Sequence, residues 1–147
     1  MSIAKLRELG FADGLAYHLL NYDESSLLGF RCQPPSKWRM SPIAERRITA
    51  IWECGTTLVY FDNSAKLFGK CSIENIDETW GQYSSAQAIL SDLIVELYED
   101  GQTCDELRTV AGQLGFVHIE RFLVEVEENS GPPYEEWRKR FPSTCNG

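Results

Sequence analysis

Three short β-type segments between residues 48 and 73 constrain the fold of this chain more than any other feature. Residues 48–52 are rich in β-branched and apolar side chains, and residues 56–61 form a second run of this kind. Residues 62–65 supply turn chemistry, and residues 67–73 then alternate with the period of a strand. Connections this short leave no room for a crossover, so the pattern predicts a three-stranded antiparallel meander.

The second half of the chain has the periodicity and punctuation of helices. Residues 86–97 and 107–114 each carry a continuous apolar face at helical spacing. Gly101 and Gly115 follow these segments, where a left-handed residue commonly ends a helix, and Phe116 is placed for a hydrophobic contact back to the last turn. Two helices with these ends are therefore expected.

Each of these two helices has a predicted capping box at its start, in which two side chains satisfy free amides of the first turn. Ser84 and Gln87 have the required spacing before the first helix. Thr103 and Glu106 have the same spacing before the second helix.

Shorter helices are expected near both ends of the chain. Residues 3–9 and 15–20 keep helical spacing, and a last helix is expected at residues 134–141. Residues 119–126 fit either a helix or a strand. We favour the helix because the Asn-Ser-Gly-Pro-Pro stretch that follows this segment is a typical helix stop.

Length and composition fit a single domain of the α+β class over residues 1–147. Apolar residues make up 43% of the chain, which is enough to close a core. The meander at about residues 48–73 would form a small antiparallel sheet covered by helices, most of them in the C-terminal half. No segment approaches the ~20 apolar residues of a membrane span, and the charged start does not fit a signal peptide. Five scattered cysteines without a Cys-x-x-Cys pair indicate reduced thiols, so a cytoplasmic protein is expected.

No constellation of catalytic or metal-binding residues can be identified. His18 and His118 each lie between apolar neighbours, which favours a partly buried histidine over a general base or a metal ligand. Cys54 is favoured as a packed thiol, because a nucleophile would need a base or cation nearby. The adjacent Glu53 would oppose ionisation if the two side chains were close. Zinc-ligand spacings, Gly-x-Ser-x-Gly elbows and phosphate-binding loops do not occur in the sequence. Neither a cofactor nor a metal is expected.

The formal net charge of −8 argues against nucleic-acid binding and is compatible with a basic protein partner. Short basic clusters at residues 37–39, 46–47 and 138–140 are interpreted as charged neighbours of core aromatics rather than as base-stacking sites. Carboxylates crowd two expected helix ends, where each opposes the helix dipole at a cost of ~0.3–1 kcal/mol. They mark either a functional surface or an ordinary solvated face. The candidate partner-binding residues are Glu96, Glu99, Asp100, Asp105, Glu106, Glu125, Glu127 and Glu128.

From Trp52 onward, a succession of motifs resembles the SMI1/KNR4 (SUKH) superfamily. The family's Leu-Pro element and Asn-Gly turn are not readable in the first 45 residues, so the chain resembles a branch that is divergent at its N-terminus. The resemblance implies an α+β fold and a role as a bacterial immunity protein that blocks a toxin, or as an adaptor, and it implies no catalytic residues. The motifs are Trp-Glu-Cys-Gly at 52–55, Leu-Val-Tyr-Phe at 58–61, residues 68–73 before Trp80, Leu-Tyr-Glu-Asp at 97–100, Leu-Gly-Phe at 114–116 and Tyr-Glu-Glu-Trp-Arg-Lys-Arg-Phe at 134–141.

We therefore expect a non-enzymatic protein-binding module, either an immunity protein or a related adaptor. The expected partner is a protein, such as a basic toxin domain, and the expected state is a monomer or weak dimer. Two alternatives stay open. A small enzyme with a site around His18 or His118 would need a pocket with a carboxylate nearby. A regulatory or structural subunit would show an extensive apolar patch repeated about a two-fold axis.

Overall fold

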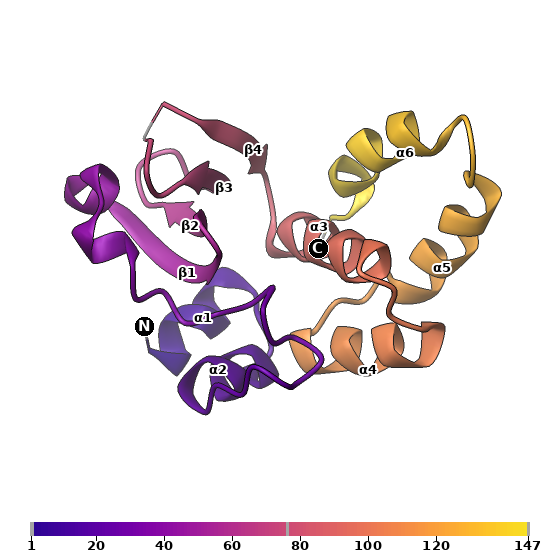
Figure 1. Cartoon of the computed structure of the whole chain (residues 1–147), viewed down its shortest axis with the longest axis horizontal. Helices are drawn as coiled ribbons and strands as arrows, with labels where there is room; N and C mark the ends of the chain where they lie inside the picture. The colour runs from indigo at the N-terminus through magenta and orange to yellow at the C-terminus, as the bar shows by residue number, and fades with distance from the viewer. Residues whose placement is uncertain (1, 76, 147) are drawn as a thin grey trace.

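The computed structural model describes residues 2–75 and 77–146, and within them it shows a four-stranded antiparallel sheet and six α-helices (Figure 1). The strands pair in the order β1-β2-β3-β4, so β1 and β4 lie at the two edges of the sheet. The predicted α+β class and the antiparallel meander at residues 48–73 are confirmed. The strands are β1 (Ile48–Cys54), β2 (Thr57–Asp62), β3 (Leu67–Ser72) and β4 (Thr79–Tyr83).

Strand β4 extends the predicted meander by one strand that the sequence pattern did not indicate. It pairs with β3, with Gln82 opposite Gly69. All of its residues are exposed or half-buried, and Gly81 interrupts it near the middle. A strand without a buried face lacks the alternation from which strands are recognised, which explains why it was missed.

The helices follow the predicted segments, and residues 119–126 form a helix rather than a strand. Three short 3-10 turns complete the described elements: η1 (Trp38–Met40), η2 (Pro42–Glu45) and η3 (Phe141–Thr144). None of the described helices is both long and apolar enough to cross a membrane. The helices are α1 (Ile3–Leu9), α2 (Asp13–Leu20), α3 (Ala86–Glu99), α4 (Cys104–Leu114), α5 (Ile119–Glu128) and α6 (Tyr134–Arg140).

The capping box at the start of α4 is confirmed. The amide of Glu106 donates to the Thr103 hydroxyl at 3.2 Å, and the amide of Thr103 donates to the Glu106 carboxylate at 2.9 Å. Two of the free N–H groups at this end are thereby satisfied within the chain.

The capping box predicted from Ser84 and Gln87 is wrong. Ser85 is the N-cap residue of α3, and its hydroxyl accepts the amide three residues along at 3.1 Å. Gln87 instead donates to the Gly115 carbonyl at 2.8 Å and accepts the Val117 amide at 3.0 Å. The side chain that sequence spacing assigned to a cap therefore joins α3 to the connection between α4 and α5.

The predicted helix ends at Gly101 and Gly115 are confirmed. Gly101 has a φ of 97° and Gly115 a φ of 79°, both in the left-handed region that glycine adopts without strain. After Gly115 the amide of Phe116 donates to the Ala111 carbonyl at 2.9 Å, and the Phe116 ring is buried. This is the predicted return of the chain onto the last turn of α4.

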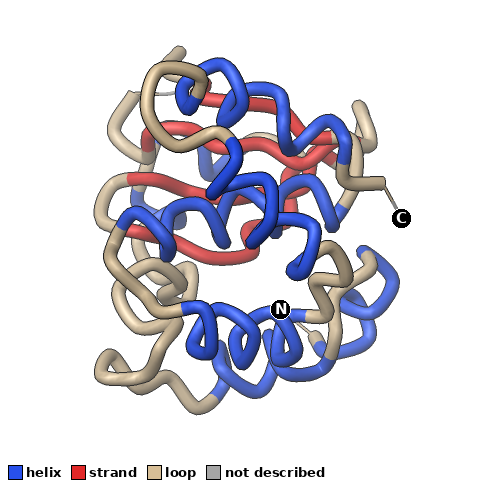
Figure 2. The backbone as a smooth tube through the Cα atoms, turned by 90° about the vertical axis from the view of Figure 1, so that its right-hand side faces the viewer, coloured by secondary structure: helices blue, strands red, loops and turns tan. Residues whose placement is uncertain are grey.

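The core consists of two apolar clusters on opposite faces of the sheet. The main cluster packs the helices against Trp52, Val59 and Phe68, and Figure 2 shows the helices crossing in front of the strands. The smaller cluster lies on the other face, where Leu58 contributes to a group that also contains Ile43 of η2. Because side chains alternate along a strand, neighbouring residues of β2 belong to different clusters.

Candidate functional site

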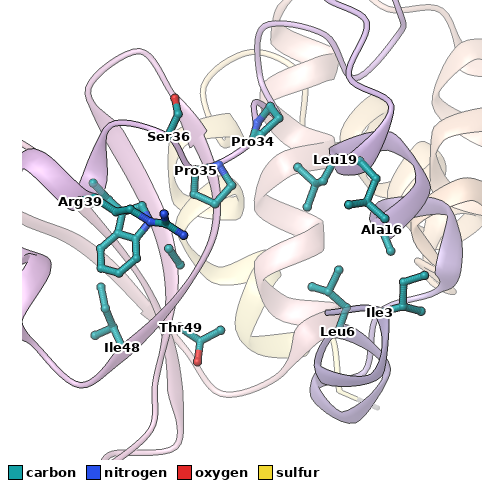
Figure 3. A pocket seen from close by; sticks show the side chains of 13 residues that line it. Ile3, Leu6, Ala16, Leu19, Pro34, Pro35, Ser36, Arg39, Ile48 and Thr49 are labelled. Atoms are coloured by element: carbon teal, nitrogen blue, oxygen red, sulfur yellow. The ribbon is translucent and has the colours of Figure 1, made fainter. Parts of the chain in front are cut away.

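An apolar groove separates the N-terminal helices from the first strand, and Figure 3 shows its walls. Its volume is about 420 Å³, which is within the range of ligand-binding pockets. One wall comes from α1 and α2, the other from the segment that leads to η1, and β1 runs between them. We call this the β1 groove; it is lined by Ile3, Leu6, Ala16, Leu19, Leu20, residues 34–36, residues 38–39 and residues 48–50.

The two walls of the β1 groove belong to different apolar clusters. Leu6 lies in the main cluster and Leu19 packs against it, whereas Trp38 and Ile48 pack against the smaller cluster. The Leu20 side chain lines the groove and is 65% exposed. The groove therefore exposes apolar surface where the two clusters fail to meet, and such surface commonly marks an interaction site.

The outer edge of β1 runs along this groove and is paired only at its end. Gln33 forms an antiparallel bridge with Glu53, in which each amide donates to the other carbonyl at 2.8 Å. Pro34 and Pro35 follow, and because proline has no N–H the pairing cannot continue. In the part of the chain that the structure describes, no backbone hydrogen bond from outside the sheet reaches residues 49–51.

The buried carboxylate of Glu53 fixes the wall that carries Trp38. Its Oε1 atom accepts the amides of Lys37 at 2.8 Å and Trp38 at 2.9 Å. The side chain is fully buried, and its Oε2 atom has no partner among the described residues. One strand residue thus holds the start of η1 in place by charge-assisted hydrogen bonds.

Four cations occur in the segment that carries this wall and leads into β1. Lys37, Arg39, Arg46 and Arg47 are all exposed, and Arg39 lines the groove itself. Among the described residues, Arg39 and Arg47 take part in no ion pair. Glu45 is the one acidic residue between positions 37 and 47, so the rim is locally positive although the chain carries a net charge of −8.

A second, smaller cleft of about 250 Å³ lies where α3 crosses the sheet, and we call it the charged cleft. Lys70 of β3 lies between two carboxylates of α3, with Nζ at 2.6 Å from Asp92 and 2.7 Å from Glu96. Arg31 adds a contact of 2.9 Å to Glu96 and one of 2.7 Å to Asp100. The carboxylates thus come from α3 and its C-cap, and the cations come from distant parts of the chain.

The third cation of the charged cleft, Arg138 of α6, pairs with Glu99. Its Nε atom lies 2.9 Å from the Glu99 carboxylate, which also accepts the Tyr134 hydroxyl at 2.7 Å. Burial works to raise the pKa of Glu99, but these two donors outweigh it and the pKa is lowered overall. The hydrogen bonds from Arg31 lower the pKa of Asp100 in the same way. Arg31 and Arg138, which lie outside α3, thus compensate the carboxylates that oppose the dipole of this helix.

Burial and neighbouring charges shift the pKa values of both Lys70 and Glu96. Burial acts to lower the pKa of Lys70, but the negative charges of Asp92 and Glu96 outweigh it and raise the pKa above its ordinary value. Burial raises the pKa of Glu96, and Lys70 opposes that rise only in part. Each of the three cations of the cleft is matched to a carboxylate at 2.6–2.9 Å.

The other predicted acidic residues have partners that differ from those of Glu96, Glu99 and Asp100. Glu106 is engaged in the capping box, and Asp105 makes a loose 3.3 Å contact with Arg108. Glu125 accepts from Trp137 at 3.1 Å and pairs with an arginine on its own helix. Glu127 and Glu128 lie at the end of α5, and within the described residues they form no ion pair. Of the eight candidates, these last two and Asp105 remain the most available to a partner.

The two histidines lie in different settings. His18 is 4% exposed, and its Nε2 atom lies 2.6 Å from the carbonyl of Cys32. His118 is half-buried at the start of α5, with Nε2 at 2.9 Å from the carbonyl of Asn146. Both rings thus contact backbone carbonyls, and within the described residues neither has a carboxylate partner.

Cys54 lies in the charged cleft beside the Arg31 guanidinium, with Sγ 4.0 Å from Nη1. Burial raises the pKa of the Cys54 thiol, and the arginine opposes this only in part. The Glu53 carboxylate is not close to this thiol, because it binds the start of η1 on the other face of the sheet. A raised pKa disfavours the thiolate that a nucleophile requires.

Within residues 2–75 and 77–146, no three His, Cys, Asp or Glu residues are placed to hold a metal ion. Comparison of the chain with protein-family models, with curated protein sequences and with solved structures gives no match. The resemblance to the SMI1/KNR4 superfamily consequently stays a prediction.

Proposed function

We propose that this chain is a non-enzymatic protein-binding module that holds a segment of its partner in the β1 groove. The observation that carries the proposal is the groove itself, a cavity of about 420 Å³ with apolar walls beside the open edge of β1. Grooves of this type are used for peptide recognition, because an apolar wall supplies affinity and backbone groups fix the orientation.

The engagement of the charged groups supports binding over catalysis. General acid–base catalysis needs a group that can exchange a proton with a bound substrate. In the charged cleft, Lys70, Arg31 and Glu96 are each committed to partners at 2.6–2.9 Å. Their role is to hold α3 on the sheet, which stabilises the scaffold that presents the groove.

The resemblance to the SMI1/KNR4 superfamily makes an immunity protein or a related adaptor the class that we propose. A net charge of −8 attracts a basic partner, such as a toxin domain. This attraction acts over distances shorter than the screening length of the salt. Among the candidate residues, the exposed carboxylates of Asp105, Glu127 and Glu128 can contribute to such steering. Steering mainly raises the association rate, whereas the apolar groove sets the lifetime of the complex.

The proposal is tested with the protein encoded next to this chain in its genome, by calorimetric titration at low and at physiological salt. Leu20→Glu places a charge in the groove at a residue that is already 65% exposed, so the fold is retained. Tyr17→Glu is the matched control, because Tyr17 is on the same helix, is 68% exposed and does not line the groove. We expect a tenfold or greater loss of affinity for the first variant only, about 1.4 kcal/mol or more. Equal affinities of the two variants in a measurable complex would exclude the groove as the binding surface.

A further inference from the structure

We infer that the segment held in the β1 groove is an extended peptide that adds to the sheet as an antiparallel strand beside Ile48–Ala50, with acidic residues flanking an apolar centre. This inference rests on the proposed function and specifies the occupant of the same groove. It follows from the backbone of β1, from the two apolar walls and from the charge of the rim.

The backbone argument starts from the bridge between Gln33 and Glu53. Its two hydrogen bonds of 2.8 Å show that the outer edge of β1 accepts an antiparallel neighbour with good geometry. The chain's own neighbour is interrupted at Pro34, so the edge continues towards Ile48 without it. Unpaired N–H and C=O groups at an edge are a template for another strand. A second segment in line with Gln33 would complete that pairing.

The length of the added strand is limited by an irregularity in β1. The register of β1 against β2 shifts between Ala50 and Trp52, which leaves Ile51 as an extra residue. Such a bulge twists the strand and ends regular pairing. The regular edge therefore comprises Ile48, Thr49 and Ala50. The Arg47 carbonyl accepts from Asn63 beyond β2, so by the alternation of an antiparallel strand Thr49 also faces β2, whereas Ile48 and Ala50 face the outer edge. The Ile48 amide already donates to the Arg46 carbonyl at 2.8 Å, so a bound peptide would pair with the Ile48 carbonyl and with both backbone groups of Ala50.

The walls define the side chains of the peptide. Alternate residues of a strand point to opposite sides, so a strand at this edge presents one set to Leu6 and Leu19 and the other to Trp38 and Ile48. Both sets would meet apolar surface, which favours a short run of β-branched or other apolar residues. A helix, about 10 Å across with its side chains, would leave the groups of the β1 edge unpaired.

The rim defines the charge of the flanking residues. Arg39 lines the groove, and Arg47 directly precedes the lining residue Ile48. Among the described residues, neither arginine has an acidic partner. Salt limits the reach of a charge to about 8 Å under physiological conditions, so the local positive rim outweighs the negative charge elsewhere on the chain. Aspartate or glutamate on either side of the apolar run complements this rim.

The test selects ligands from a phage-displayed library of random linear dodecapeptides on the immobilised full chain. Leu20→Glu serves for counter-selection, and Tyr17→Glu serves as the control. The expected peptides carry an apolar run with acidic flanks and lose affinity for Leu20→Glu but not for Tyr17→Glu. Selected sequences with helical spacing of their apolar residues, with basic flanks, or with equal affinity for both variants would overturn the inference. A selection that enriches no groove-dependent peptide would overturn it as well.

Strand addition is then examined on the best synthetic peptide by calorimetry and amide NMR. Two peptides are made, one N-methylated at its odd-numbered residues and one at its even-numbered residues. Only one of the two loses the amide donors that face β1. That peptide should bind about three- to tenfold more weakly for each hydrogen bond lost, and the other peptide should bind as before. New protection from exchange should appear at the Ala50 amide, since the Ile48 amide already donates to the Arg46 carbonyl and the Thr49 amide faces β2. Equal losses of affinity for the two N-methylated peptides would contradict strand pairing. Displacement of the peptide by a single-stranded oligonucleotide would show that the groove is a nucleic-acid site, which would also contradict the inference.

The outcomes separate this inference from the function on which it rests. A partner complex that is weakened by Leu20→Glu but is not displaced by the peptide supports the groove and refutes strand addition. A partner complex indifferent to Leu20→Glu refutes the groove itself.

Discussion

Removal of Lys70 tests how strongly the charged cleft holds α3 to the sheet. The Lys70, Asp92 and Glu96 side chains are 15%, 8% and 14% exposed, so all three charges are largely withdrawn from water. Removing one partner of a buried ion pair costs about 3–5 kcal/mol, because the opposite charge stays buried without compensation. For Lys70→Met we expect the lower end, about 3 kcal/mol, because Arg31 still pairs with Glu96 at 2.9 Å. Only Asp92 is then left without its cation.

The loss is measured by urea unfolding followed through tryptophan fluorescence and by thermal unfolding. A loss of this size lowers the Tm of a chain of this length by about 6–12 °C. The double variant Lys70→Met/Asp92→Asn removes the stranded charge together with the lysine, so it should recover most of the stability. Lys139→Met is the control, since Lys139 is exposed on α6 and its replacement should change stability by no more than about 0.5 kcal/mol.

The pH dependence of the Lys70→Met defect has a definite sign. Burial raises the pKa of Glu96 even in the presence of Lys70, and without this lysine the pKa rises further. A carboxyl whose pKa is higher in the folded state stabilises the fold below its unfolded pKa, about 4.3, and loses that contribution as the pH rises through its folded pKa. The defect should therefore shrink near pH 4 and be largest at neutral pH. A loss of unfolding free energy below about 1 kcal/mol at pH 7 would refute the claim that Lys70 holds α3 to the sheet through a buried ion pair. A defect that grows on acidification would refute it as well.

Three further predictions concern single residues. Ser85→Ala should destabilise the protein by about 1 kcal/mol in urea unfolding and Ser84→Ala should not, because only Ser85 caps α3; the reverse order would restore the cap predicted from the sequence. Gly115→Ala should cost more than about 1 kcal/mol, since φ is 79° and the new Cβ would lie 2.8 Å from a neighbouring Cβ. Gly112→Ala lies in the interior of α4, where the new Cβ would have no heavy atom within 4 Å, and it should stabilise the protein by about 0.5–1 kcal/mol. Similar effects of the two changes would contradict the left-handed conformation at Gly115. Cys104 is the exposed cysteine among the five and should react with a thiol reagent fastest in the native protein, a result that mass spectrometry would contradict by finding another site labelled first.

The parts of the fold that were predictable from the sequence are those set by neighbouring residues. The capping box of Thr103 and the left-handed Gly115 bound α4 through contacts within a few positions, so their spacing is sufficient to place them. Helix α5 was predicted because its stop signal resolved an ambiguous periodicity. Strand β4 was not, because its residues have no buried face and it is held by pairing with β3.

The candidate site was less predictable because it joins distant residues. The spacing of Glu96, Glu99 and Asp100 indicated charges at a helix end, but Arg31, which pairs with Glu96, is 65 positions away in the sequence. A pattern of acidic residues contains no information about such a partner. The β1 groove escaped prediction for the same reason, since its walls come from α1, α2 and residues 34–39, and each segment alone has ordinary apolar residues.

Strand β1 governs both the edge and one wall of its groove. The carboxylate of Glu53 holds the amides of Lys37 and Trp38, while the backbone of Glu53 holds Gln33. Residues 33–38 are therefore attached to the same strand that would receive a ligand. Because β1 pairs with β2 on both sides of Ile51, the edge and this wall of the groove are preorganised. A preorganised receptor loses little conformational entropy on association, which favours recognition of a segment only a few residues long.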